Sequence, residues 1–344
     1  MSVFNDYWIL KEILVFSSIM RAYFLLTLGL LGLSSFAQTP RLFYEHHKFS
    51  ALSGNVSVEM PEKGHWGSSA IAVGDVDQDG IIDLATAAPD DSLGSLWILF
   101  MESDSSIRES RKLGASDLQA SLTKMGGFGL SLEALGDWDG DSIPDLAVGE
   151  PYGKLGPLDY GKVWLIMLNR DGSVKKSLIL SGRTPGLIRK LNRESRFGAD
   201  IHAVGDLNQD GTKDLLVGAP GNPAKGTGKT WRLFLNADGS VKEAVSLFPT
   251  DKKGLSLLER GVQFGTSLES YVDENRIYLL IGAPLDDDAG VNAGALWWHE
   301  LGTDKWAKWV PGQNTLLLDV KNEDRWGSGI AVLNDLNQDS IPEI

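Results

Sequence analysis

Short apolar runs alternate with polar, glycine-rich turns along most of this chain. Runs such as Lys162–Leu168, Val174–Leu180 and Val241–Leu247 are of strand length and are bounded by turn residues, which predicts β-strands. Turns such as 169–172 (Asn-Arg-Asp-Gly) are typical of strand hairpins. No segment after residue 37 has convincing helical periodicity. Four consecutive strands joined by tight turns form one blade of a β-propeller, so the pattern predicts an all-β chain.

The pattern repeats along the chain at a nearly constant spacing. Pairs of an aromatic residue and glycine begin at positions 66, 128, 197, 264 and 326. In the first three copies a proline follows at the same distance from the aromatic residue (66 to 89, 128 to 151, 197 to 220). Each complete unit then has a glycine shortly before a tryptophan, at Trp97, Trp164, Trp231 and Trp297. A long, regular period with several strands per unit is typical of a propeller, and we expect these tryptophans to pack between blades.

An acidic loop lies inside this frame four times, with oxygen-bearing side chains at positions 1, 3, 5 and 9. The copies are Asp75, Asp77, Asp79 and Asp83; Asp137, Asp139, Asp141 and Asp145; Asp206, Asn208, Asp210 and Asp214; and Asp335, Asn337, Asp339 and Glu343. Packed carboxylates repel one another unless a cation lies between them, and Ca²⁺ takes six to eight oxygen ligands in irregular geometry. The sequence therefore predicts up to four Ca²⁺ ions, each also bound by the position-7 carbonyl of Ile81, Ile143, Thr212 or Ile341.

An EF-hand does not fit these loops. It needs a bidentate Glu at position 12, where this chain has Thr86, Val148 or Val217 within apolar runs. The fourth repeat departs from the others, because Phe264 and Pro284 lie closer together than the matching pairs and the segment 271–276 lacks the acid spacing. We expect this blade to keep the scaffold and to lose the metal.

Charge and composition narrow the function classes. The chain has 344 residues, no cysteine and a net charge of −14, so disulfide scaffolds and thiolate sites are excluded. The four loops together carry as many carboxylates as the whole charge deficit. Nucleic-acid binding requires clustered Lys and Arg, so we expect no nucleic-acid partner.

The N-terminus is typical of a secretory signal peptide. Met20 and Arg21 precede an apolar run from Ala22 to Leu33, and a small-x-small cleavage site ends at Ala37. We therefore interpret residues 1–37 as a signal peptide with Met20 as a possible true start, and we expect a secreted or cell-surface protein whose mature chain has no membrane span. The alternative is an uncleaved N-terminal anchor. Residues 38–64 are expected to form an N-terminal strand segment.

The combination of Phe-Gly, acidic loop and Gly-Ala-Pro resembles the FG-GAP repeats of the integrin α-subunit head. The segment 282–295 (Gly-Ala-Pro-Leu-Asp-Asp-Asp-Ala-Gly-Val-Asn-Ala-Gly-Ala) is especially similar. The resemblance implies a seven-bladed β-propeller with Ca²⁺ held between the first two strands of certain blades, and an extracellular binding or adhesion role. No Arg-Gly-Asp tripeptide is visible, and FG-GAP propellers also occur in secreted bacterial proteins, which is the type expected here.

This resemblance predicts the domain organisation. Blade repeats are expected at residues 65–126, 127–195, 196–262 and 263–324, with a truncated fifth repeat at 325–344. About four and a half of seven blades are then present, so we interpret the chain as a fragment.

Three function classes remain open. The first is an extracellular interaction or adhesion module, with structural calcium and an unidentified protein or glycan ligand. The second is a carbohydrate-binding propeller that uses exposed aromatic side chains. The third is the accessory propeller of an enzyme whose catalytic domain lies outside this sequence. No nucleophile elbow, phosphate loop or zinc motif occurs, and the five histidines have the spacing of packing or surface residues, so we expect no enzymatic activity in this chain.

Overall fold

The computed structural model describes residues 64–119, 121–155, 158–250, 256–273, 276–313, 320–333, 335–336 and 342–344. The signal-peptide and N-terminal strand predictions lie outside these residues. No helix is present in the described parts of the chain, and hence none that is long and apolar enough to cross a membrane.

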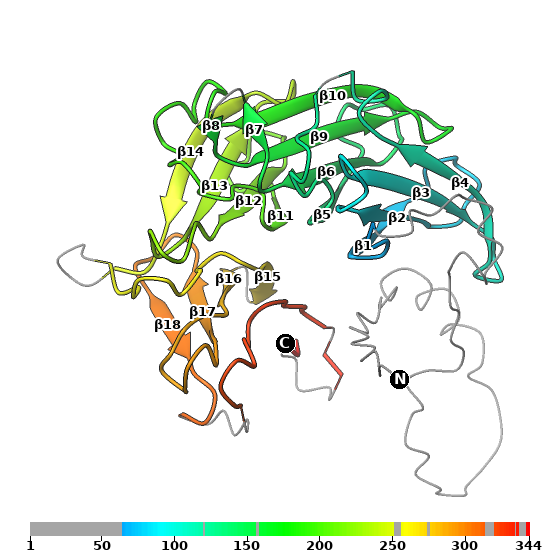
Figure 1. Ribbon diagram of the computed structural model, residues 1–344. Coiled ribbons are helices and arrows are strands. Elements are labelled where there is room, and N and C mark those ends of the chain that lie inside the picture. The colour runs from blue at the N-terminus through cyan, green and yellow to red at the C-terminus, as the bar shows by residue number, and fades with distance from the viewer. Residues whose placement is uncertain are drawn as a thin grey trace, which may run out of the picture.

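Four antiparallel sheets of four strands follow one another along an arc (Figure 1). The first sheet has β1 (Ser69–Gly74), β2 (Asp83–Ala88), β3 (Ser95–Met101) and β4 (Ile107–Leu113). The second has β5 (Leu132–Gly136), β6 (Asp145–Glu150), β9 (Lys162–Leu168) and β10 (Val174–Ser181), with a small hairpin of β7 (Lys154–Leu155) and β8 (Leu158–Asp159) between its second and third strands.

The third sheet has β11 (Ile201–Gly205), β12 (Asp214–Ala219), β13 (Lys229–Leu235) and β14 (Val241–Leu247). The fourth has β15 (Leu268–Asp273), β16 (Arg276–Ala283), β17 (Ala295–Glu300) and β18 (Trp306–Trp309). The predicted all-β class with four-stranded antiparallel blades is therefore confirmed, while closure into seven blades and the exact repeat boundaries stay predictions.

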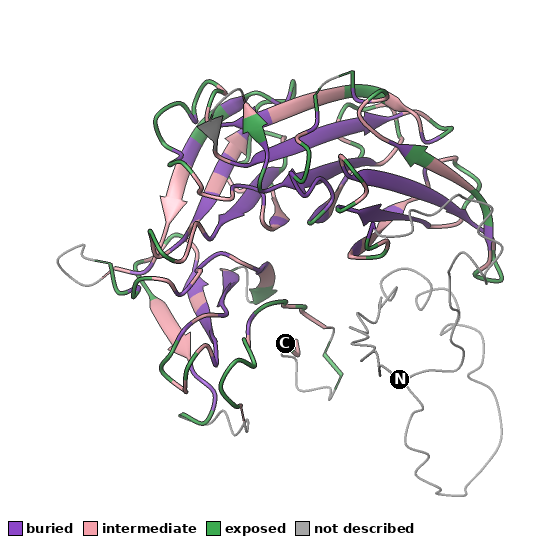
Figure 2. Cartoon of the chain, viewed as in Figure 1, coloured by how far each residue is buried: buried purple, intermediate pink, exposed green. Residues whose placement is uncertain are grey.

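The hydrophobic core lies between neighbouring blades. The second strands β2, β6 and β12 are buried along their whole length, because both of their faces are covered (Figure 2). The repeated tryptophans Trp97 and Trp164 are fully buried, and Trp164 meets the ring of Phe128 edge to face with centroids 5.9 Å apart. The predicted packing between blades is found for Trp164, whose core cluster combines residues of the first and second blades, whereas Trp97 clusters with residues of its own blade.

The repeated glycines form the seams between blades. The carbonyl oxygen of Gly198, in the Phe-Gly pair of the third blade, lies directly against Gly149 of the second blade and accepts a 3.0 Å hydrogen bond from Ser131 Oγ. A Cβ atom added to Gly149 would overlap that oxygen. The same close approach recurs between Gly218 and Gly265 and between Gly282 and Gly327. Glycine at these positions is therefore required by space, which explains why both halves of the motif repeat.

The first strands of the blades line a central hollow of about 960 Å³. His202 on β11 lies between two glutamates of the neighbouring blades, with Nδ1 3.7 Å from Glu133 Oε1 and Nε2 3.3 Å from Glu269 Oε1. Burial raises the pKa of the Glu133 carboxyl to about 8 and lowers the pKa of His202. Three strands from three blades thus place a titratable cluster on the wall of this hollow.

The residues described beyond 320 form no strand, but they continue the seam. Trp326 N–H donates a 2.8 Å hydrogen bond to the carbonyl of Ala293 in the fourth blade, as Phe264 N–H does to Thr227 at 3.1 Å. The fifth repeat therefore begins with the same contact as the others.

We predict that Gly149→Ala lowers the free energy of unfolding by about 1–3 kcal/mol, because the added methyl group must displace backbone of the next blade. Gly114→Ala is the control, since nothing lies within 4 Å of a Cβ atom there, and it should cost less than about 0.5 kcal/mol. Urea unfolding of both variants measures this difference. Equal stability of the two variants would contradict the requirement for glycine at position 149.

We also predict that Glu133→Gln changes the pH dependence of stability. The pKa of Glu133 is raised from 4.5 to about 8 in the folded chain. The neutral carboxyl therefore contributes its full stabilisation of the fold below about pH 4.5, and this contribution is lost as the pH rises through 8. The amide stays neutral and can still accept the 2.8 Å hydrogen bond from Ala203 N–H. At pH 9 the variant should exceed the wild type by about 1–3 kcal/mol, with little difference at pH 5. Exposed Glu109→Gln is the control, and thermal unfolding at both pH values is the measurement.

Candidate metal centre

The acidic loops connect the first two strands of the first three blades. Each follows a break in strand register, between Ala72 and Gly74 in the first blade and at the matching places in β5 and β11. Positions 4 and 6 of each loop have positive φ, with Gln78 at 60° and Gly80 at 92° in loop one. Loop two has its glycine at position 4 and Ser142 at position 6, so the same backbone path forms with the glycine at the other position.

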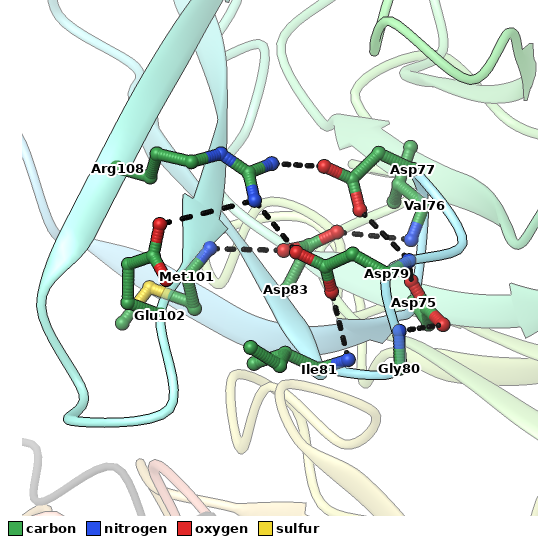
Figure 3. Close-up of polar contacts among 10 residues, drawn as sticks. All are labelled: Asp75, Val76, Asp77, Asp79, Gly80, Ile81, Asp83, Met101, Glu102 and Arg108. Carbon is green, nitrogen blue, oxygen red and sulfur yellow. Dashed lines mark hydrogen bonds and ion pairs between the residues drawn. The ribbon is translucent and has the colours of Figure 1, made fainter.

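The position-1 carboxylate holds the turn together (Figure 3). In loop one, Asp75 accepts hydrogen bonds from the N–H groups of Asp79 at 2.9 Å and Gly80 at 2.8 Å. Asp137 in loop two and Asp206 in loop three accept the same kind of backbone bonds. These bonds draw the backbone around the carboxylate, so the turn is already curved around its acids.

The position-9 carboxylates of the first three loops are fully buried, whereas the other loop acids are at the surface. Asp83 accepts from Val76 N–H at 2.9 Å within its loop and from Met101 N–H at 3.0 Å on the third strand. Asp145 makes the equivalent pair of bonds to Trp138 and Leu168. Burial raises the pKa of Asp83 and of Asp145 to about 6, and it also raises the pKa of Asp214. A buried anion of this kind favours a nearby cation.

Positions 1, 3 and 9 converge in the first two loops. One carboxylate oxygen from each of Asp75, Asp77 and Asp83 lies within 4.8 Å of the others, and Asp137, Asp139 and Asp145 are arranged in the same way. Three hard oxygen donors at this separation, one of them buried and fixed by two backbone bonds, suit the donor set that Ca²⁺ prefers.

The position-5 carboxylates of Asp79, Asp141 and Asp210 lie outside this close group, because each is held by other partners, and they stay predicted ligands. Asp79 Oδ1 accepts from Ile81 N–H at 2.8 Å, and its Oδ2 lies 2.6 Å from the guanidinium of Arg108 on β4. Asp141 and Asp210 are held in the same way, by Lys175 and Lys242. These basic partners keep the pKa values of the three position-5 carboxyls below their usual range. The position-7 carbonyls of Ile81, Ile143 and Thr212 stay predicted ligands.

Loops three and four carry neutral substitutions. In loop three, Asn208 Oδ1 accepts from Asp210 N–H at 3.1 Å, as Asp77 does from Asp79 N–H in loop one. In loop four, Glu343 accepts a 2.7 Å bond from Leu336 N–H, which is the same bond from position 2 to position 9. Asn337, Asp339 and Ile341 lie outside the described residues. The described ends of loop four therefore meet as in the other loops.

The fourth blade lacks the loop. Strands β15 and β16 pair without a register break as far as Asp273 and Arg276, so only two residues separate the paired strands where the other blades have the acidic loop. The expected loss of the metal in this blade stays a prediction.

The acid spacing does not predict the three basic residues that contact the loops. Arg108, Lys175 and Lys242 each follow a serine and a β-branched residue at the start of the outermost strand, in the segments 106–108, 173–175 and 240–242. This short repeat was the available signal, but its meaning depends on a contact with a loop that is distant in the sequence.

Comparison with known proteins supports this reading of the repeats. The FG-GAP repeat model matches residues 128–166 and 197–231, which include loops two and three. Integrin alpha-3 of Mus musculus is 30% identical over 213 residues, covering 60% of this chain and 18% of that protein. Integrin alpha-IIb of Homo sapiens is 32% identical over 163 residues, covering 44% of this chain and 14% of that protein.

A relative of another kind matches a longer stretch. Phosphatidylinositol-glycan-specific phospholipase D of Homo sapiens is 29% identical over 304 residues, covering 82% of this chain and 34% of that protein. The match thus spans about a third or less of each of these relatives. The chain therefore carries FG-GAP repeats, folded into four-stranded antiparallel blades of the β-propeller type, and is similar to integrin α subunits.

Proposed function

We propose that this chain is an extracellular interaction module whose blades are stabilised by Ca²⁺ bound in the acidic loops. The observation that carries the calcium assignment is the convergence of positions 1, 3 and 9 in the same place on two blades. Position 9 of each of these loops also accepts a bond from the third strand, so an ion bound there would link three strands of one blade. Calcium in this role stabilises the scaffold and performs no chemistry.

The interaction role is supported by the similarity to integrin α subunits and by the signal peptide that the sequence predicts. Our proposal includes secretion or display at the cell surface and an extracellular protein or glycan as ligand. Among the described aromatic residues, Trp297 is buried, and Trp298 is stacked on Tyr278 with centroids 5.0 Å apart. Trp297 is thus closed to a ligand, whereas the half-buried Trp298 and the exposed Tyr152 keep a glycan among the proposed ligands.

A second candidate function is an accessory propeller of an enzyme. It is favoured by the match of 82% of this chain to a relative named as a phospholipase D. In that case the chain would position or stabilise a catalytic domain and would have no activity of its own. Identification of the domains encoded with this chain separates the two functions.

We predict that chelation destabilises the full chain. Binding to the folded state adds about 2.7 kcal/mol per site at a hundredfold excess of calcium over the dissociation constant. Melting in excess EGTA should therefore occur several degrees lower than in millimolar CaCl₂, and protease cleavage should be faster. MgCl₂ in place of CaCl₂ is the control, since Mg²⁺ demands a smaller and more regular site. A melting temperature that does not respond to the chelator would contradict structural calcium.

We also predict that loop one binds calcium more tightly than loop three, because it has four carboxylates where loop three has three and Asn208. Calorimetric titration of two matched variants tests this. Asp75→Ala should remove a tight binding event, and Asp206→Ala should remove a weaker one. The reverse order would show that ligand charge does not rank the loops.

A further inference from the structure

Each of the first three acidic loops has a basic partner that is built into its own blade. Arg108 contacts the carboxylates of Asp77 and Asp79 in loop one (Figure 3). Lys175 Nζ lies 2.7 Å from Asp139 Oδ2 and 2.6 Å from Asp141 Oδ2 in loop two. Lys242 Nζ lies 2.9 Å from Asp210 Oδ2 in loop three. The partner therefore always reaches position 5, and in loops one and two it also reaches position 3.

A register break in the outermost strand of each of these three blades sets the direction of the basic side chain. Arg108 is the extra residue where Met101 pairs with Ile107 and Phe100 pairs with Glu109. Lys175 and Lys242 are the extra residues at the corresponding irregularities of β10 and β14. A β-bulge bends its strand and redirects a side chain, and bulges occur preferentially beside functional sites. The direction of these three side chains is thus set by the backbone.

The fourth blade is an internal comparison. Its described residues form no acidic loop, and its strands β17 and β18 pair in unbroken register from Leu296 to His299, where the paired stretch ends. In the first blade Ile98 pairs with Arg111, and Arg108 lies three residues before Arg111. The equivalent pair in the fourth blade is Trp298 with Ala307. The residue three positions before Ala307 is Asp304, so an acid stands where the first blade has Arg108. The loop, the bulge and the basic partner are therefore present together in three blades, and the described part of the fourth blade has none of them.

We infer that Arg108, Lys175 and Lys242 are tethered cations that compete with calcium for the carboxylates at positions 3 and 5. This inference rests on the proposed function, because it concerns how the same loops bind calcium. Each basic group offsets the repulsion among the loop acids when calcium is scarce, and it must release at least one carboxylate oxygen when calcium binds. The three residues thus reduce calcium affinity and preserve the folded loops at low calcium.

Loop two allows this to be measured by itself. Trp138 occupies position 2 of that loop, where loops one, three and four have Val76, Leu207 and Leu336. Terbium(III) is an oxygen-seeking ion of similar size to calcium, and its emission is sensitised by a neighbouring indole. Terbium emission that disappears in Trp138→Phe reports loop two, and its displacement by added calcium gives the calcium affinity of that loop in the full chain.

The test compares Lys175→Met with Lys176→Met. Both changes remove one positive charge, but Lys176 is paired within the strand ladder, and the ion pairs described for loop two are made by Lys175. Lys175→Met should tighten calcium binding at loop two by about threefold to tenfold, the range expected for loss of one or two exposed ion pairs. It should also lower the melting temperature in EGTA, so that the difference between EGTA and CaCl₂ widens. Lys176→Met should stay within about twofold of the wild type.

The outcomes separate the two levels of the argument. The competition between Lys175 and calcium would be contradicted if Lys175→Met had unchanged or weaker calcium affinity. It would also be contradicted if Lys176→Met tightened binding equally. Either result would leave the assignment of calcium to the loop intact. Lys175→Arg keeps the charge and should retain the wild-type affinity, so tightening in that variant would also contradict the competition. Wild-type protein whose loop-two emission is absent, or is unaffected by Asp139→Ala, would contradict the calcium loop itself and the inference with it.

Discussion

The close approach of backbone between neighbouring blades is the contact on which the rest of the structure depends. The carbonyl of Gly198 lies against Gly149, and the same arrangement recurs at the next two seams. Because no side chain can stand there, the Phe-Gly pair of one blade packs directly on the second strand of the preceding blade, and the second strands are buried along their whole length. Between the first and second blades the glycine of the second strand is replaced by Ala87, whose methyl group lies against Gly129. One small side chain is accommodated there only because glycine faces it.

This rigid seam fixes the ends of the strands and therefore the loops. Each acidic loop of the first three blades begins and ends on strands whose positions are set by the neighbouring blade, so its buried position-9 carboxylate has a constant place. The bonds from Met101 to Asp83 and from Leu168 to Asp145 show that the third strand also takes part. Charge repulsion inside the loops is thus opposed by backbone donors, by a buried core and by a basic side chain from the fourth strand. All four strands of a blade contribute to one loop.

The fourth blade shows that these features are separable from the fold. It retains the aromatic contact between Phe264 and Trp297, with centroids 6.3 Å apart, and it retains the glycine seam to the next repeat. Its described strands have neither the acidic loop nor the bulge. The scaffold therefore forms without the loop chemistry, which is consistent with loops that add stability to a blade whose packing is already complete.

The sequence by itself determined the strand pattern, the repeat unit, the buried tryptophans and the positions of the acidic loops. These follow from local periodicity and from motifs that lie close together in the chain, where spacing alone constrains the structure. Tertiary structure decided which acids converge, because only the fold buries Asp83 and turns Asp79 toward Arg108. It also decided the His202 cluster, whose members come from three blades. Such contacts depend on strand register, bulges and blade packing, and none of these can be read from the spacing of residues along one chain.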